Sequence, residues 1–251
     1  MKLTMHDKIS DFLPSFAQGA QTYEQVAWVQ KAAAKTLVDS LIKQYPVFYP
    51  NRILDVGSGT GYVVENLLPF FPNSTYILND IEPKMLNNAV KKLQHFSNIS
   101  YQIGDAEKCK FMPNELTISN MAFQWFEDLP ITINRLSSNS EILAFSILLD
   151  GTFSEWWELC DFYGAQFLRP SYYKYEELAQ VCANINPRDL WLLRKEVELD
   201  MDSPLAFIRY VKQLGANLSN SVHCPKLLSM LRQERGRLLT KYQLCFVILR
   251  K

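Results

Sequence analysis

The amino-acid sequence predicts an α/β protein with a doubly wound, mostly parallel seven-stranded sheet of the Rossmann-like kind. Three observations support this fold class. Short apolar runs alternate with amphipathic stretches from residue 53 onward, a glycine-rich turn follows the first apolar run, and 251 residues suffice for one large domain. Because strands that alternate with helices pair in parallel through right-handed crossovers, helices are expected on both faces of the sheet.

The segment before this alternation, residues 5–44, is expected to be helical. Its apolar residues fall on two stripes with helical spacing. The stripes are Ile9, Phe12, Leu13 and Phe16, and Val26, Val29, Ala33, Leu37 and Leu41. Pro46 and Pro50 then end the pattern. The sequence therefore predicts an N-terminal helical cap over residues 1–45, either a lid over a site or a helix that only packs on the core.

Residues 46–200 are expected to form the α/β core. Apolar runs predict strands at 53–56, 75–78, 99–103, 116–119, 142–147 and 191–199. Helical spacing predicts helices at 62–70, 83–95, 128–136, 154–165 and 175–183. Pro83 favours a helix start, since proline is well tolerated in the first turn.

The last part of the chain is expected to return to the sheet. Helical spacing over 204–214 and 225–239 predicts a helical insertion, residues 201–240, on the substrate side. The apolar run Leu244–Leu249 predicts the last strand, within residues 241–251. The insertion thus lies between two strands that complete the sheet.

Composition excludes several classes of function. Basic and acidic residues number 26 each, so the formal net charge is zero, which argues against a dedicated nucleic-acid-binding protein. The five cysteines and three histidines are scattered without metal-ligand spacing, so no metal site is expected. No segment approaches the roughly 20 apolar residues of a membrane span, and no leader pattern opens the chain. We therefore expect a cytoplasmic protein that does not enter a membrane.

The strongest functional signal is the turn after the first predicted strand. It contains Asp55, Gly57, Ser58, Gly59 and Gly61, followed by Tyr62. The dinucleotide fingerprint requires a small residue where Tyr62 stands, and no phosphate-binding lysine follows. The turn therefore suits a ligand without a phosphate, such as the aminoacyl part of S-adenosylmethionine. Asp55 either anchors the turn or binds the ligand's ammonium group, and a tight turn without a ligand is the alternative.

The ends of the next two predicted strands carry carboxylates. Asp80, about 19 residues beyond Gly61, is expected to accept hydrogen bonds from ribose hydroxyls, or to cap the following helix. Asp105 is expected to accept the adenine amino group, while Ala106 offers its backbone N–H. Ile81 and Met85 are assigned to the same cofactor site.

The fourth predicted strand ends in Ser119-Asn120-Met121-Ala122-Phe123-Gln124-Trp125. Asn120 and Met121 are expected beside the sulfonium and its methyl group. Gln124 and Trp125 are expected to face the acceptor, whereas Phe123 is interpreted as a core residue.

Together these segments resemble the class I S-adenosylmethionine-dependent methyltransferases, and more closely the malonyl-acyl-carrier-protein O-methyltransferases of biotin synthesis (the BioC type). The resemblance runs nearly end to end. Its most specific part is the S-N-x-A-x-Q-W signature at Ser119–Trp125, and Phe16–Tyr23 with Gln30 is similar to the family's opening pattern. Phe145-Ser146, Lys212–Asn217 and Leu239–Tyr242 are further matching segments. The chain departs from the family at Ser58, in the turn 136–140 and in the segment 167–170.

The resemblance implies methyl transfer to the carboxylate of malonyl-acyl carrier protein. This carboxylate is already ionised at neutral pH, so no general base is needed. Tyr23, Gln124, Trp125 and Arg169 are the candidate catalytic residues, and Arg169 is expected to pair with the acceptor carboxylate. Acyl carrier proteins are acidic, so a basic docking surface is expected. Its candidates are Lys226, Arg232, Arg235, Arg237 and Lys241.

Two other functions stay open at this stage. A methyltransferase for a free small molecule, such as a dicarboxylic acid or a quinone precursor, would keep the cofactor residues and change only the acceptor side. A non-catalytic protein that retains the fold and binds the cofactor is the third possibility. The complete set of carboxylates and glycines argues against the non-catalytic alternative, because a relic has no physical need for all of them.

Overall fold

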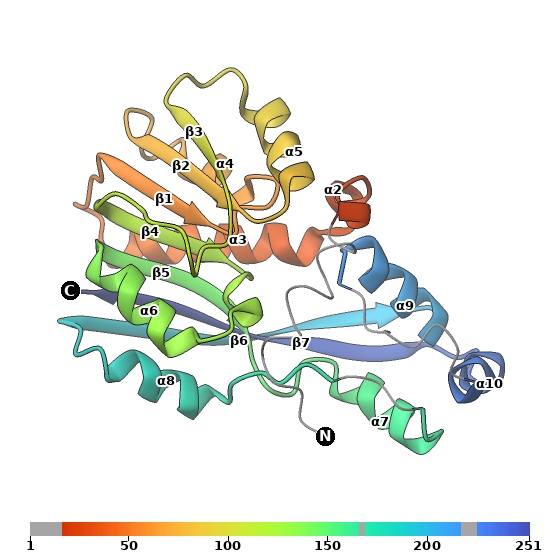
Figure 1. Cartoon of the computed structure of the whole chain (residues 1–251). Helices are drawn as coiled ribbons and strands as arrows, with labels where there is room; N and C mark the ends of the chain where they lie inside the picture. Colours follow the sequence, from red (N-terminus) through yellow and green to blue (C-terminus); the bar gives the residue numbers. More distant parts are fainter. Residues whose placement is uncertain (1–16, 166–168, 217–224) are drawn as a thin grey trace.

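The computed structural model describes residues 17–165, 169–216 and 225–251, and one seven-stranded sheet organises them (Figure 1). Its strand order is β3-β2-β1-β4-β5-β7-β6. The strands are β1 (Arg52–Val56), β2 (Thr75–Asp80), β3 (Ile99–Ile103), β4 (Asn114–Asn120), β5 (Ser140–Leu148), β6 (Asp189–Met201) and β7 (Leu238–Arg250). Pairing is parallel from β3 to β5, and β7 is antiparallel to both β5 and β6. The predicted doubly wound, mostly parallel sheet is confirmed.

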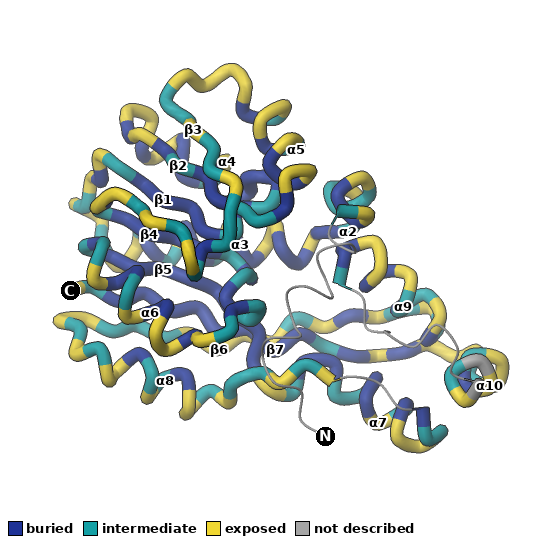
Figure 2. The backbone as a smooth tube through the Cα atoms, in the orientation of Figure 1, coloured by how far each residue is buried: buried dark blue, intermediate teal, exposed yellow. Residues whose placement is uncertain are grey.

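Helices cover both faces of the sheet (Figure 1). One face carries α3 (Trp28–Gln44), α4 (Tyr62–Leu67) and α5 (Pro83–Leu93), and the other carries α6 (Leu129–Ser138) and α8 (Tyr175–Ala183). The central strands β1, β4, β5 and β7 are buried almost throughout, because apolar residues cover them from both sides (Figure 2). No described helix combines the length and the apolar character that crossing a bilayer requires.

The N-terminal segment is not one continuous helix in its described part. A short helix α2 (Tyr23–Val26) is separated from α3 by Ala27, whose backbone leaves the helical region with φ −80° and ψ 39°. The first of the two predicted apolar stripes, at residues 9–16, lies outside the described residues. Of the second stripe, Val29, Ala33, Leu37 and Leu41 are buried on α3, whereas Val26 ends α2 and is half-buried.

The last two strands are longer than the sequence predicts. The predicted helix over 225–239 ends at Gln233 (α10, Pro225–Gln233), and β7 begins at Leu238. Gly236 interrupts the helical segment, and the side chains from 238 to 240 alternate between buried and exposed, as in a strand. Beyond the last β5 pair, Leu148 with Leu244, strands β6 and β7 continue alone to the pair Met201–Leu238.

Three further helices stand around this extended part of β6 and β7. They are α7 (Ser154–Phe162), α9 (Pro204–Gln213) and α10, and the predicted helical insertion between β6 and β7 is present (Figure 1). Phe153 and Phe207 pack edge to face with ring centroids 4.9 Å apart, which ties α9 to the start of α7. This arrangement places the insertion beside the end of the sheet where the polar strand ends gather.

Candidate active site

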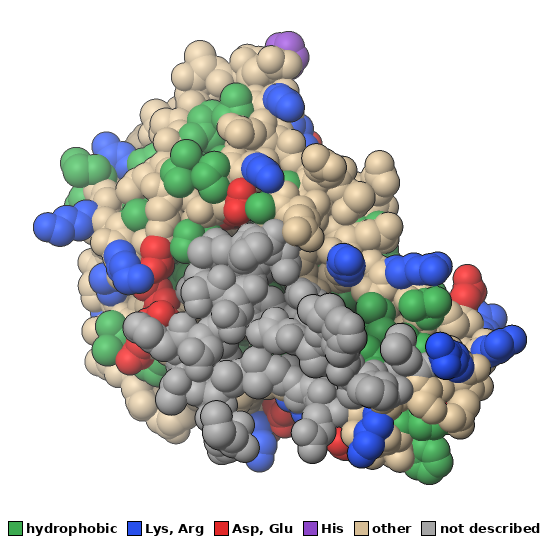
Figure 3. All heavy atoms as spheres, turned by 45° about the vertical axis from the view of Figure 1, so that its right-hand side comes forward, with side chains coloured by type: hydrophobic (Ala, Val, Ile, Leu, Met, Phe, Trp, Pro, Cys, Tyr) green, Lys and Arg blue, Asp and Glu red, His purple; other side chains and the backbone are tan. Residues whose placement is uncertain are grey.

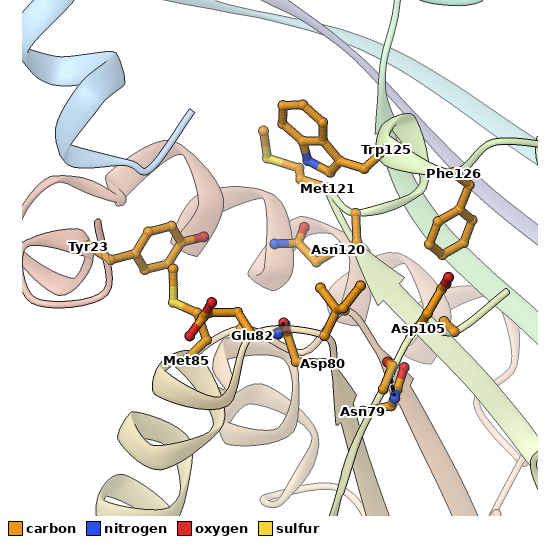
Figure 4. Close-up of a pocket in the computed structure, with 16 residues that line it drawn as sticks. Tyr23, Asn79, Asp80, Glu82, Met85, Asp105, Asn120, Met121, Trp125 and Phe126 are labelled. Atoms are coloured by element: carbon orange, nitrogen blue, oxygen red, sulfur yellow. Dashed lines mark hydrogen bonds between the residues drawn. The ribbon is translucent and has the colours of Figure 1, made fainter. Parts of the chain in front are cut away.

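A cavity opens at the carboxyl ends of β1, β2, β3 and β4 (Figure 4). Ligands of open α/β sheets bind at this edge, since the loops after parallel strands converge there. The cavity holds about 850 Å³ of space between atoms, part of it open to solvent. Its lining residues are Tyr23, Gly57, Gly59, Asn79, Asp80, Ile81, Glu82, Met85, Gly104, Asp105, Ala106, Asn120, Met121, Ala122, Trp125 and Phe126. Most of the predicted cofactor residues lie here.

Two glycines of the turn line the cavity, Gly57 and Gly59, and they differ in how much space surrounds them. Gly57 has φ +64°, and a Cβ at this position would lie 2.3 Å from the Cβ of Ala122. Gly59 has φ +55°, and a Cβ there would meet no atom within 4 Å. Gly57 therefore allows the turn to approach the end of β4, whereas Gly59 leaves open space beside the backbone for a ligand.

Asp80 connects the glycine turn to the start of α5. Its Oδ2 accepts a hydrogen bond from the N–H of Gly59 at 2.8 Å, and its Oδ1 accepts one from the N–H of Glu82 at 2.9 Å. The N-cap of α5 is Glu82, whose side chain accepts from the N–H of Lys84. Asp80 is therefore not the helix cap, and its remaining lone pairs are available at the cavity wall.

Asp55 is a buried carboxylate in β1, only 1% exposed, and neither of its oxygens has a hydrogen-bond partner among the described residues. Burial raises the pKa of Asp55 well above its ordinary value, and the charge of Asp80 raises it further. A buried acid without a partner is stabilised when a cation binds nearby. The pair Asp55 and Asp80 thus fits a positively charged ligand such as S-adenosylmethionine.

Replacement of Asp55 with asparagine is expected to change how stability depends on pH. The carboxyl titrates near pH 3.9 in the unfolded chain and at a higher pH in the folded protein, so the folded state binds more protons between these values. As pH rises through that window, the wild type should lose stability relative to Asp55→Asn, by up to about 1.4 kcal/mol per pH unit. Denaturant unfolding of both proteins without ligand at a series of pH values measures this difference. Parallel stability curves would contradict the raised pKa.

The wall of the cavity that follows β3 carries Asp105 and Ala106. Asp105 accepts a hydrogen bond from the N–H of Glu107 at 2.9 Å and forms an ion pair with Lys108 at 2.8 Å. The Asp105 carboxyl group keeps acceptor capacity beyond these two contacts, because each carboxylate oxygen has two lone pairs. Ala106 is buried, and its small side chain leaves room between the turn and the cavity.

The end of β4 is held in an uncommon backbone conformation. Met121 has φ +53°, and its N–H donates to both the backbone oxygen and the Oγ of Ser146 at 3.0 Å. Asn120 accepts from the Ser146 hydroxyl at 2.7 Å and donates to the backbone oxygen of Gln30 at 3.0 Å. A positive φ at a residue other than glycine costs about 1–3 kcal/mol and often marks a functional site. These contacts hold both residues against the cavity.

Tyr23 closes the cavity from the α2 side (Figure 4). Its hydroxyl points toward the middle of the cavity, opposite Asp105 and Phe126. Burial raises the pKa of Tyr23, and the charge of Asp80 contributes in the same direction, so the hydroxyl stays protonated and can donate. The predicted neutral donor Trp125 also lines the cavity.

Five predicted site residues do not line this cavity. Asp55 and Ser58 are buried beneath it, and Gly61 packs on α5, where a Cβ would lie 3.0 Å from Leu93. Gln124 donates its amide to the backbone oxygen of Met121 and faces an adjoining cavity beside Tyr172.

Arg169 is the fifth of these residues. Its guanidinium pairs with Asp161 and donates to the backbone oxygen of Trp157 at 3.2 Å. It also stacks over the Trp157 ring, 5.4 Å from the centroid, and its side chain is 44% exposed. Arg169 therefore does not reach the cavity as expected for a partner of the acceptor carboxylate, because its charge is already paired with Asp161.

Some lining residues were missed by the sequence analysis, namely Asn79, Glu82, Gly104, Ala122 and Phe126. Asn79 donates to the backbone oxygens of Gln102 and Gly104, both at 3.0 Å, and so joins the ends of β2 and β3. The sequence does place Asn79, a polar residue, one position before the end of a buried strand, and this position could have indicated a site residue. Phe123 is fully buried against Phe145, with ring centroids 4.7 Å apart, and its interpretation as a core residue is confirmed.

Comparison with known proteins identifies the family. A family described as "Methyltransferase domain" matches residues 53–138. The malonyl-[acyl-carrier protein] O-methyltransferase of Neorickettsia risticii is 33% identical over 239 residues, covering 92% of each chain. The protein of the same name from Magnetococcus marinus is 31% identical over 229 residues, covering 85% of this chain and 80% of its own.

Solved structures share the fold at low identity. Haemonchus contortus phosphoethanolamine N-methyltransferase 2, in complex with phosphomonomethylethanolamine and S-adenosylhomocysteine, superposes with a TM-score of 0.58 and 16% identity. The match covers 94% of this chain and 57% of that chain. At this identity the solved structure shows the fold alone, and the two sequence relatives, each matched over most of its length, show the family: this chain belongs to the malonyl-[acyl-carrier protein] O-methyltransferase family.

Proposed function

We propose that this protein transfers the methyl group of S-adenosylmethionine to the free carboxylate of malonyl-acyl carrier protein. The methyl ester formed would start pimeloyl chain synthesis for biotin. The observation that carries this proposal is the match over 92% of the chain to a relative named for this acceptor. The cavity supports it, because its carboxylates and positive-φ turn suit a cationic ligand that has no phosphate.

In this proposal each wall of the cavity holds one part of the cofactor. Asp80 binds the ribose, Asp105 and Ala106 the adenine, and the turn at Gly57 and Gly59 the aminoacyl part. Ile81 and Met85 add apolar contacts, while Asn120 and Met121 lie beside the sulfur. The cofactor supplies an electrophilic methyl group on a positively charged sulfur, and the chain's residues orient it.

The acceptor side needs no base in this reaction. A malonyl carboxylate is already ionised at neutral pH, so the protein has to bind it, orient it and exclude water. Tyr23 and Trp125 line the cavity, and each side chain carries one neutral donor group. Alignment of the carboxylate with the methyl group can lower the barrier by up to about 7–11 kcal/mol.

Mass spectrometry of the carrier protein tests the acceptor. Incubation of malonyl-acyl carrier protein with enzyme and S-adenosylmethionine should add one methyl group. Calorimetry should show binding of S-adenosylmethionine and S-adenosylhomocysteine and no binding of NAD. Methylation of free malonate without methylation of the carrier would instead favour a small-molecule methyltransferase. Cofactor binding without any methylation would favour a non-catalytic protein.

The proposed carrier-docking surface differs from the sequence expectation. Arg237 is paired with Asp200 and Lys241 with Glu196, so both charges are already compensated. Lys226 and Arg232 on α10, and Arg235 two residues after it, remain exposed. Figure 3 shows several Lys and Arg side chains on the side of the molecule that carries α9 and α10. We assign the acidic carrier protein to this side.

Charge reversal at Arg232 and Arg235 is expected to raise the KM for the carrier substrate about tenfold, because each surface charge contributes up to about 1 kcal/mol. Cofactor affinity should stay unchanged, and added salt should slow the reaction of the carrier more than that of a short malonyl thioester. Steady-state kinetics with both acceptors measures this difference. Lys43→Glu, at the exposed end of α3, is the matched control. Equal KM values for variant and wild type would exclude this docking surface.

The compartment proposed for the reaction is the cytoplasm. Among the described residues, Cys109, Cys160, Cys182 and Cys245 form no disulfide. Free thiols are typical of proteins that work under reducing conditions.

A further inference from the structure

The segment that carries Tyr23 is hydrogen-bonded both to α5 of the parallel core and to α9 of the helical insertion. On one side, Asn88 of α5 donates its amide to the backbone oxygen of Ala20 at 2.7 Å. On the other side, the hydroxyl of Thr22 donates to the backbone oxygen of Gln213, the last residue of α9, at 2.9 Å. The placement of α2 therefore depends on polar contacts to both neighbours.

Lys92 adds a charged contact to these hydrogen bonds. Its Nζ lies 2.8 Å from Oε1 of Glu24 in α2 and 3.0 Å from Oε2 of Glu65 in α4. The same ammonium stands over the ring of Tyr62, 4.2 Å from the centroid. Only 22% of the Lys92 side chain is exposed, so solvent screens these interactions less than those of a fully exposed pair.

Glu24 is held as an anion by this arrangement. Burial alone would raise the pKa of Glu24, but its hydrogen bond to Lys92 lowers it, and the net pKa lies below the ordinary value. Lys31 adds a second, longer ion pair to Glu24 at 3.6 Å. Glu24 is thus bound to α5 through Lys92 and to α3 through Lys31.

The ion pair is linked to the cavity through Tyr62. The ring of Tyr23 stacks on the ring of Tyr62 with centroids 6.0 Å apart, and Lys92 covers that same Tyr62 ring. Tyr23 is also the residue directly before Glu24. Removal of the ammonium would therefore loosen two supports of Tyr23 at once, its neighbour in the chain and the ring on which it stacks.

We propose that Lys92 is a positioning residue that holds α2, and with it Tyr23, closed against the cofactor cavity. Lys92 itself does not line the cavity and touches no reacting atom. This inference rests on the proposed function, since it takes the cavity to be the cofactor site. The proposal implies that S-adenosylhomocysteine leaves more easily when α2 moves away from the cavity, so the ion pair contributes to how long this product stays bound.

The test compares release of S-adenosylhomocysteine from the full-length wild type and from Lys92→Gln. Stopped-flow dissociation should be about fivefold faster in the variant, the lower end of usual coupling between two sites. Added salt should speed release from the wild type and change release from Lys92→Gln little, because the screened ion pair is gone. Lys92→Arg should restore slow release, since a guanidinium can also bridge the two carboxylates.

Two controls separate positioning from general stability. Lys91→Gln removes the same charge one residue earlier on α5, at an exposed position, and should release the product like the wild type. Glu24→Gln should speed release as Lys92→Gln does, and the double variant should be no faster than either single variant. Melting temperatures without ligand show whether each variant is folded.

Several results would overturn the inference. Wild-type release from Lys92→Gln, equal effects of Lys91→Gln and Lys92→Gln, or additive effects of Glu24→Gln and Lys92→Gln would each exclude the positioning role while leaving the proposed function intact. A wild type that does not bind S-adenosylhomocysteine would contradict the proposed function itself.

Discussion

Asp80→Ala is expected to weaken binding of S-adenosylmethionine by about 1.5–3 kcal/mol, the range for hydrogen bonds that involve a charged group. This loss corresponds to a Kd raised roughly 10- to 150-fold. The substitution also leaves the N–H groups of Gly59 and Glu82 without their acceptor, so the glycine turn loses its connection to α5. Calorimetry on the folded variant measures the effect.

The control for Asp80 is an acidic residue that only caps a helix. Asp128 accepts from the N–H of Ile131 at the start of α6 and does not line the cavity. Asp128→Ala should cost about 0.5–2 kcal/mol of stability and leave the Kd of the cofactor unchanged. If Asp80→Ala kept the wild-type Kd while both variants lost similar stability, Asp80 would have a structural role alone.

Gly57→Ala is expected to damage both stability and binding. The new Cβ would lie 2.3 Å from the Cβ of Ala122, and φ is +64°. Overpacking costs about 1–3 kcal/mol and the left-handed conformation about 1–2 kcal/mol more, so stability should fall by roughly 2–5 kcal/mol. Cofactor affinity should fall as well, because the displaced turn lines the cavity. Denaturant unfolding and calorimetry measure the two losses.

The structure offers a matched rescue for this variant. Ala122→Gly removes the atom that clashes, so Gly57→Ala/Ala122→Gly should regain the overpacking part of the lost stability. Gly59→Ala should behave differently, since its Cβ meets no atom within 4 Å and the residue lines the cavity. The Gly59→Ala substitution should therefore reduce the free energy of cofactor binding by more than it reduces the free energy of unfolding. A Gly57→Ala protein that is no more stable with Ala122→Gly than without it would refute the packing explanation.

The fold could be predicted from the sequence because the spacing of apolar residues and the positions of turn residues indicate the same helices and strands over most of the chain. The parallel core strands lie where the apolar runs predict them, for instance β3 at Ile99–Ile103. The boundary between α10 and β7 could not be predicted in this way. Residues 234–239 contain no long apolar run, and their strand conformation comes from pairing with β6, a partner distant in sequence.

The candidate site was predictable where a residue's position at a strand end determines its direction. Asp80, Asp105 and Asn120 lie at or directly after such ends and reach the cavity. Arg169 and Gln124 do not reach it. Arg169 lies in a loop and Gln124 in the one-turn helix Phe123–Trp125, and the course of such segments depends on packing that sequence spacing does not reveal. The pairing of Arg169 with Asp161 joins residues eight positions apart, which no motif indicates.

The unequal lengths of the strands have a consequence for how this protein can change. Strand β5 stops pairing with β7 at Leu244. From the pair Glu196–Gln243 to the pair Met201–Leu238, β6 and β7 therefore form a two-stranded ribbon outside the main sheet. Such a ribbon is only marginally stable by itself, so α7 and α9 supply the packing that keeps it folded. Ribbon and helices therefore form a cooperative unit that can open while the parallel sheet stays intact. Evolution can lengthen or shorten this ribbon in steps of two residues without turning its buried face outward. The part of the protein proposed to bind the acceptor can thus change while the strand ends proposed to bind the cofactor stay the same.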